Sequence, residues 1–213
     1  MRLEPVQSLA DVIEIRLDAM DVPAVEACCR LLPHPLLFTN RPQWEGGLWH
    51  GSEEDRLEYL LEAMAMQAAY VDLELRAEPV FRRRLLAARD RSSTRIILSW
   101  HDFQQTPSIG ELQDVLHEMM GSGADIGKIV AMARHSGDVV RLQQILVEAN
   151  EHDFPLICFS MGEAGRISRL ATLFLGGFMT YTSADDRQMT APGQLSAEKM
   201  AALCRLLGGE DDD

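Results

Sequence analysis

Lys128 is the residue of this sequence whose surroundings most clearly suggest chemistry. It lies in the segment GADIGKIVAMA (123–133), whose apolar residues would otherwise form a buried strand. A buried ammonium group is costly unless it is paired or gives up its proton. A desolvated lysine near other cations loses its proton more easily, and the neutral amine can attack a ketone to form a Schiff base. A structural lysine paired with Glu14 or Glu74 is the alternative, and this segment alone leaves both interpretations open.

His101 lies at the mouth of the fourth predicted strand, in the segment ILSWHDF, and this strand precedes the lysine strand. Neighbouring strands of a sheet lie about 5 Å apart, so His101 and Lys128 can approach each other. A histidine within reach of an iminium can remove the proton that the iminium acidifies on the adjacent carbon. A lone histidine is more often structural than catalytic, so the pairing with the lysine carries this hypothesis.

Charged residues also alternate along, or follow, the first two predicted strands. IEIRLD places Glu14, Arg16 and Asp18 on one face of a strand, which would be ordinary on a surface edge strand. TNRPQWEGG places Arg41 and Glu45 just beyond the second strand, where a charged surface turn is the alternative interpretation.

Two later segments suit an anionic ligand. RISRLA carries Arg169 beyond the sixth predicted strand, and TAPGQLS offers Thr190, backbone N–H groups and Gln194 near a helix start. Anions are favoured at helix starts. A Pro-Gly turn with Ser196 as the N-cap is the alternative for the second segment.

These residues must be positioned by alternating strands and helices. The predicted strands are 12–18, 35–40, 69–75, 94–102, 125–132, 155–161 and 176–182. The segments between them mostly place apolar residues at the spacing of a helix. Strict alternation predicts a parallel α/β sheet, either a barrel or a doubly wound sheet. IRLDAMD contains no glycine, which argues against a dinucleotide-binding domain.

A TIM-type (β/α)8 barrel is therefore the predicted fold, with seven countable strands and the first βα unit lacking. Such a barrel typically takes about 250 residues, and this chain has 213. We expect one barrel domain over residues 1–207 and a solvated acidic tail over 208–213.

Composition excludes several classes of function. Apolar residues make up 46% and charged residues 25%, and the net charge of −13 makes nucleic acid and anionic membranes poor partners. There is no apolar run of about 18 residues and no secretory signal pattern, which predicts a cytoplasmic protein. The cysteines show no metal-binding spacing, so we expect free thiols in a reducing compartment and no metal.

Seven segments, taken in order, resemble type I 3-dehydroquinate dehydratase, the Schiff-base enzyme of the shikimate pathway. They are EIRLD, LLFTNRPQWEGG, YVDLEL, ILSWHDFQQTP, GADIGKIVAM, MGEAGRISRL and TAPGQ, and they span about residues 11–200. The resemblance implies a hydro-lyase of aromatic amino acid biosynthesis that acts on the anionic substrate 3-dehydroquinate. It implies no cofactor, and a homodimer is common in the family.

The resemblance also implies a role for each matching residue. Lys128 would form the imine with the C3 ketone, His101 would take a proton from C2 and assist loss of the C1 hydroxyl, and Glu45 would orient the histidine. The substrate-binding positions would be Glu14 and Arg16 at the ring hydroxyls, Met161 on the apolar wall, and Arg41, Arg169, Thr190 and Gln194 around the carboxylate. Thr190 stands where the family usually has serine, and it keeps the hydroxyl.

The N-terminus departs from the family, whose members begin with a strand and a helix ahead of EIRLD. A downstream start, an open barrel or another element in the gap would each account for the difference, and an unclosed barrel predicts reduced stability or association through the gap. Two other functions are considered: a Schiff-base aldolase-type lyase, and a catalytically impaired paralogue that binds a ligand or a partner enzyme.

Overall fold

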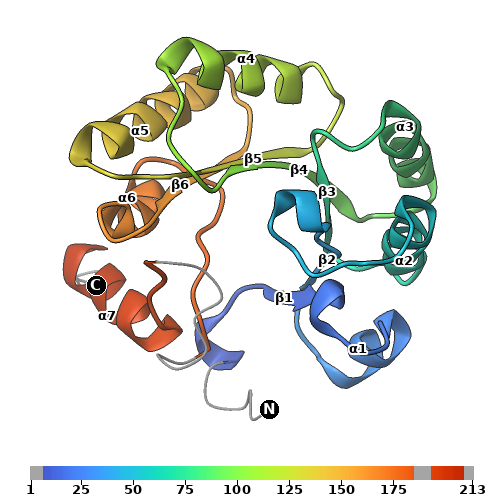
Figure 1. Ribbon diagram of the computed structural model, residues 1–213. Helices are drawn as coiled ribbons and strands as arrows, with labels where there is room; N and C mark the ends of the chain where they lie inside the picture. Colours follow the sequence, from blue (N-terminus) through green and yellow to red (C-terminus); the bar gives the residue numbers. More distant parts are fainter. Residues whose placement is uncertain (1–6, 185–192, 209–213) are drawn as a thin grey trace. The chain divides into compact units, whose positions relative to one another are not determined.

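The computed structural model describes residues 7–184 and 193–208 of the chain (Figure 1). The chain divides into two compact units. The first, here called the Lys128 unit, comprises Val12–His101 and Val115–Lys128. The second, here called the Arg169 unit, comprises Met1–Asp11, Asp102–Asp114 and Ile129–Asp213.

The Lys128 unit begins with three strand–helix repeats. Its elements are β1 (Ile13–Arg16), η2 (Leu17–Ala19), α1 (Val25–Leu31), β2 (Leu36–Thr39), η3 (Gln43–Glu45), α2 (Glu53–Ala65), β3 (Tyr70–Glu74), α3 (Pro79–Ala88) and η4 (Arg89–Arg91). Three further elements run from one unit into the other: β4 (Arg95–Asp102), α4 (Ile109–Met120) and β5 (Ile126–Met132). The Arg169 unit adds η1 (Gln7–Leu9), α5 (Ser136–Glu151), β6 (Leu156–Met161), α6 (Arg166–Phe174) and α7 (Ala197–Gly208).

Helix α2 shows why the sequence folds as it does locally. Ser52 is its N-cap, and the Ser52 hydroxyl accepts a hydrogen bond from the backbone N–H of Asp55 at 3.0 Å. Three acidic residues occupy the first turn, where the helix dipole favours negative charge. Leu57, Leu60 and Met64 follow at helical spacing and are buried, so this apolar stripe holds α2 in the core of its unit.

The strands form one sheet in the order β1-β2-β3-β4-β5-β6. Strands β1 to β4 pair in parallel, with Arg16 opposite Thr39, Thr39 opposite Asp72, and Glu74 opposite Ser99. This register brings polar side chains from successive strands together near the carboxyl ends of β1 to β4. Parallel strands with helical crossovers commonly carry their functional residues at that end.

The prediction of an α/β protein with a parallel sheet is confirmed, but the prediction of a (β/α)8 barrel with seven strands is wrong. The described residues contain six strands in an open order, and β1 and β6 are its two edges. The segment 176–182 was the seventh expected strand. It starts with Gly176 in the left-handed conformation (φ 84°), and Phe178 donates one backbone hydrogen bond to Leu156 at 2.9 Å. Two glycines at the start of the segment break the extended run that its later residues favour.

Within residues 7–184 and 193–208, none of the helices combines the length and the apolar character that crossing a membrane requires. The prediction of a single domain over 1–207 stays a prediction.

Candidate active site

Lys128 lies on β5 with its side chain 6% exposed, and its ammonium group is paired with a carboxylate. Lys128 Nζ lies 3.1 Å from Asp72 Oδ2, on β3. Asp72 is itself fully buried. Asp72 is therefore a counter-ion of Lys128, and it is a partner that the sequence analysis did not name.

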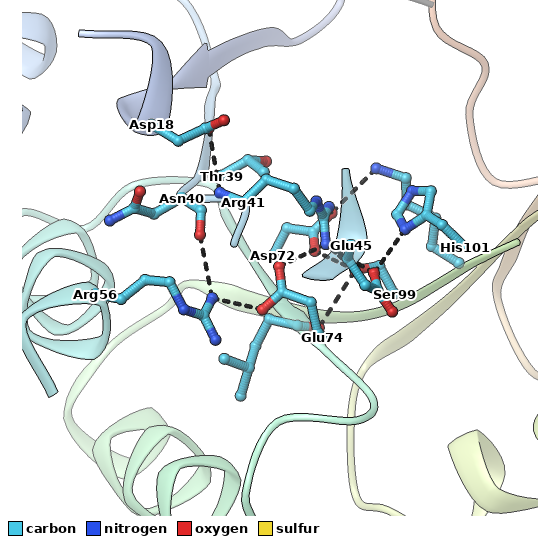
Figure 2. A network of polar contacts seen from close by, with 12 residues as sticks. Asp18, Thr39, Asn40, Arg41, Glu45, Arg56, Asp72, Glu74, Ser99 and His101 are labelled. Atoms are coloured by element: carbon cyan, nitrogen blue, oxygen red, sulfur yellow. Dashed lines mark hydrogen bonds and ion pairs between the residues drawn. The ribbon is translucent and has the colours of Figure 1, made fainter. Parts of the chain in front are cut away.

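Asp72 is the centre of a buried polar network (Figure 2). Its Oδ2 atom also accepts a hydrogen bond from Arg41 Nη2 at 2.8 Å, and its Oδ1 atom accepts one from the Ser99 hydroxyl at 2.5 Å. Burial alone would raise the pKa of Asp72, but the charges of Arg41 and Lys128 outweigh it and hold this pKa below its usual range. Asp72 is thus ionised, and its Oδ2 atom contacts both Arg41 and Lys128.

Arg41 follows β2 and is buried among protein acceptors. Its Nη1 atom donates to Glu74 Oε1 and to the Ser99 hydroxyl, both at 2.6 Å, in addition to the Nη2 contact with Asp72. Burial opposes the charge of Arg41, but Asp72, Glu74 and Glu45 together raise its pKa. In this structure the Arg41 guanidinium holds carboxylates of the protein, and its predicted contact with a substrate carboxylate stays a prediction.

His101 and Glu45 form a hydrogen-bonded pair. His101 Nδ1 lies 2.8 Å from Glu45 Oε2, and both side chains are largely buried. Burial, with the nearby charges of Arg41 and Lys128, holds the pKa of His101 well below its usual value, so the imidazole is neutral. Burial raises the pKa of Glu45 to about 8, although the charge of Arg41 opposes the shift.

The turn that carries Glu45 depends on the two glycines that follow it. Gly46 ends η3 in the left-handed conformation (φ 73°), which glycine adopts at little cost. A Cβ atom on Gly47 would lie 2.0 Å from the carbonyl oxygen of Arg41, so only glycine fits there. The EGG sequence therefore sets how closely the turn folds back onto Arg41.

Asp18 connects the end of β1 to this loop. Its carboxylate accepts hydrogen bonds from the backbone N–H groups of Arg41 at 3.1 Å and Leu48 at 3.0 Å. The same carboxylate accepts both Arg16 Nε at 2.9 Å and Arg16 Nη2 at 2.6 Å. Glu14 lies on β1 two residues before Arg16, and its carboxylate accepts a hydrogen bond from the Thr39 hydroxyl at 2.8 Å. Glu14 thus contacts the end of β2 and Arg16 contacts Asp18, and the predicted roles of both residues in substrate binding stay predictions.

The remaining predicted site residues belong to the Arg169 unit or lie outside the described residues. Met161 ends β6 and is buried, and Gln194 is buried ahead of α7. Arg169 on α6 is buried with its Cζ atom 4.5 Å from the centre of the Phe159 ring, and burial lowers its pKa to about 10. Thr190 falls outside the described residues.

Sequence reasoning did not assign the residues that hold the reactive ones in place. These are Arg56, Asp72 and Ser99, together with Asp18 and Glu74, which it named in other roles. A signal for two of them was present, because YVDLEL places two carboxylates at alternate positions of an otherwise apolar strand. Charges on one face of a buried strand need partners.

The arrangement can support covalent catalysis by an amine next to a neutral imidazole base. Among the described residues, no group of three His, Cys, Asp or Glu side chains is placed to hold a metal ion. Polar side chains gathered at the carboxyl ends of parallel strands are typical of α/β enzymes, and the catalytic role of Lys128 stays a prediction.

Comparisons with known proteins identify the family within this class. The profile of type I 3-dehydroquinase matches residues 1–211. The chain is 46% identical over 194 residues to the 3-dehydroquinate dehydratase of Desulfotalea psychrophila, covering 91% of this chain and 86% of that protein. It also resembles the crystal structure of the type I 3-dehydroquinate dehydratase of Clostridium difficile with covalent modified comenic acid. The TM-score is 0.86 at 28% identity, covering 96% of this chain and 84% of that one. The chain belongs to the type I 3-dehydroquinase family.

Proposed function

We propose that this chain eliminates water from 3-dehydroquinate to give 3-dehydroshikimate, in the shikimate pathway, through an imine on Lys128. The observation that carries the proposal is the buried lysine on β5, fixed by Asp72, in a member of this family. A buried primary amine held at one position is the group that a carbonyl substrate needs for imine formation.

Imine formation uses Lys128 as nucleophile and His101 as proton carrier. The neutral imidazole takes a proton from the ammonium group, and the free amine attacks the C3 ketone to give a carbinolamine. The imidazolium returns its proton to the carbinolamine hydroxyl, which leaves as water while the C=N bond forms. Asp72 then serves as counter-ion to the iminium, as it does to the ammonium group at 3.1 Å.

Elimination uses the same histidine. The iminium acidifies C2, His101 removes the C2 proton, and the electron pair moves into the enamine. The imidazolium then protonates the C1 hydroxyl, which departs as water as the C1=C2 double bond forms. Hydrolysis of the imine releases the product and Lys128. Glu45, 2.8 Å from His101 Nδ1, orients the ring for these transfers.

The proposed substrate-binding residues are those that the resemblance to the family implies. Arg169 is the proposed ligand of the substrate carboxylate, because a desolvated guanidinium gains most from a bidentate anion. Thr190 and Gln194 are proposed beside it, with Met161 as an apolar wall. Glu14 and Arg16 are proposed to bind the ring hydroxyls. Arg41 is proposed to contribute mainly through Asp72 and Glu74, which it contacts directly.

Borohydride trapping tests the proposal sharply, because the sequence contains only two lysines, Lys128 and Lys199. Reduction of a mixture of protein and 3-dehydroquinate should give one adduct at Lys128, which trypsin then fails to cleave. Lys128→Met should lose both the adduct and dehydration. Lys199→Met is the matched control, because Lys199 is exposed on α7, and it should keep both. Dehydration at the original rate in Lys128→Met would refute the imine mechanism.

The same experiment separates the two alternative functions. An adduct at Lys128 without turnover would indicate an impaired paralogue that binds ligand. An adduct with an aldol donor but none with 3-dehydroquinate would indicate an aldolase-type lyase.

A cytoplasmic homodimer is proposed as the form in which the enzyme works. Sedimentation equilibrium at micromolar concentration tests the dimer, and fractionation of the source cells tests the compartment.

A further inference from the structure

Arg56 is a fully buried arginine in a place where the helix does not favour it. It lies in the first turn of α2 and is 1% exposed. A cation near a helix N-terminus opposes the helix dipole, so the dipole does not account for this charge. Its contacts therefore account for its position.

The guanidinium of Arg56 joins three separate segments, and Figure 2 shows its contacts with Asn40 and Glu74. Its Nη1 atom donates to Glu74 Oε2 on β3 at 2.5 Å and to the carbonyl oxygen of Asn40 at 3.1 Å. Its Nε and Nη2 atoms both donate to Glu53 Oε2, at 3.1 and 2.7 Å. The contact with Glu53 lies on the more exposed side, whereas Glu74 and Asn40 are fully buried.

Both buried contacts lead to Arg41. Glu74 lies between two guanidinium groups, with Oε2 on Arg56 and Oε1 on Arg41. Asn40 directly precedes Arg41, so the carbonyl group of Asn40 and the N–H group of Arg41 belong to the same peptide bond. Arg56 thus fixes the main chain at Arg41 and also the carboxylate that orients the Arg41 side chain.

We propose that Arg56 is a positioning residue of the dehydration site, which acts through Glu74 and Asn40 to keep Arg41 on Asp72 and so to keep Asp72 aligned with Lys128. The proposal rests on the proposed function. No contact of Arg56 with substrate is required, because every link is a contact between protein groups.

The charge of Arg56 should affect the pH dependence of kcat/KM through Glu74. The charged groups facing Glu74 are Arg41 from the loop after β2, Arg56 from α2, Asp72 from β3 and Glu45 from η3. Burial raises the pKa of Glu74, and the two arginines oppose that shift. Removal of Arg56 leaves one opposing cation, so Glu74 binds a proton at higher pH and its hold on Arg41 weakens there. Protonation of Glu74 should therefore lower kcat/KM from a higher pH downward, as a step on the acidic limb that is separate from the titration of Glu45.

The experiment compares Arg56→Gln and Arg56→Lys with Arg84→Gln. Arg84 on α3 is the matched control. Like Arg56, it forms ion pairs with glutamates of α2, here Glu54 and Glu58, but these pairs lie at the surface. Thermal unfolding gives the melting temperature of each variant. The values of kcat and KM, the pH profile and borohydride trapping at Lys128 are then measured well below that temperature.

We expect Arg56→Gln to lower kcat/KM at least tenfold, mainly through kcat, to slow trapping and to move the acidic limb upward. Arg56→Lys keeps the charge without the fork of donors, so it should recover part of the rate and return the limb toward its original pH. In a Glu74→Gln background, Arg56→Gln should cost less than about threefold, because its main target has been neutralised.

The proposal is overturned if the Arg56→Gln variant has the same kcat and the same pH profile as the Arg84→Gln control. A lower melting temperature of Arg56→Gln would not change this conclusion. If Arg56→Gln does not fold, Arg56→Lys decides: an unchanged kcat and an unchanged acidic limb overturn the proposal. If the unsubstituted protein neither traps nor converts 3-dehydroquinate, the proposed function fails first and this inference falls with it.

Discussion

The His101–Glu45 pair predicts that catalytic efficiency rises steeply between pH 7 and pH 9. Burial raises the pKa of Glu45 to about 8 and, with nearby cations, keeps His101 neutral. A protonated Glu45 donates to His101 Nδ1, which leaves the hydrogen on Nε2 and removes the base. An ionised Glu45 accepts from Nδ1–H instead, and the Nε2 lone pair becomes available.

The size of the effect follows from the titration. With a pKa of about 8, Glu45 is roughly one-tenth ionised at pH 7 and roughly nine-tenths ionised at pH 9. We therefore expect kcat/KM to increase roughly tenfold over this range. Glu45→Gln has no ionisation, so its profile should be flat there, and its rate at pH 9 should be lower on the order of tenfold.

The same shift in the pKa of Glu45 predicts that stability falls as pH rises, whereas kcat/KM rises. A carboxyl group whose folded-state pKa is raised stabilises the fold at low pH and loses that contribution as pH rises toward the folded-state pKa. For Glu45, the difference between 4.5 and about 8 corresponds to on the order of 5 kcal/mol. The free energy of unfolding should fall between pH 5 and pH 9 more steeply in the unsubstituted protein than in Glu45→Gln.

Two measurements check this account. The appearance of the conjugated product in the ultraviolet gives kcat/KM at each pH, and urea unfolding gives stability over the same range. A flat kcat/KM between pH 7 and pH 9 in the unsubstituted protein would refute it. A rising limb that persists in Glu45→Gln would refute it equally, because another group would then be titrating.

Three further substitutions test the framework around the site. Asp72→Asn leaves two buried cations without their shared carboxylate, so we expect a loss of roughly 3–5 kcal/mol in the free energy of unfolding and no trapped adduct. Asp18→Asn loses the charge that binds two backbone N–H groups of the following loop, and urea unfolding should show a loss of about 1.5–3 kcal/mol. Gly47→Ala forces a methyl group against the carbonyl oxygen of Arg41, and calorimetry should show a destabilisation of roughly 1–3 kcal/mol with lower activity.

Local patterns predicted the elements well because each strand and helix carries its own periodicity. The run 125–132 is mostly apolar, and β5 covers Ile126–Met132. The helical spacing after Ser52 matches α2. Closure of the sheet is different, because it depends on pairing between distant strands. The segment 176–182 has apolar and β-branched residues, yet it forms no strand in the described structure, and it starts with Gly176 in the left-handed conformation.

The candidate site shows the same division. A buried lysine on β5 could be recognised from its apolar neighbours, but its counter-ion could not. Asp72 lies opposite Thr39, and Glu74 lies opposite Ser99, only through the register of three strands. Arg56 stands among the charged residues at the start of α2, a pattern typical of a solvated helix turn. Only the packing of α2 against the sheet turns that residue into a buried partner of Glu74.

Two carboxylates of this site, Asp72 and Glu45, have pKa values that move in opposite directions although both are buried. The cause is the distance to cations. Asp72 shares one oxygen with Arg41 at 2.8 Å and Lys128 at 3.1 Å, whereas Glu45 lies 3.5 Å from Arg41 and faces a neutral imidazole. Groups whose environments separate their pKa values in this way can take different parts in proton transfer. Asp72 can therefore serve as a fixed counter-ion for the ammonium and the iminium, because its charge does not change at working pH. Glu45 can change its charge in the range where the histidine must alternate between base and acid.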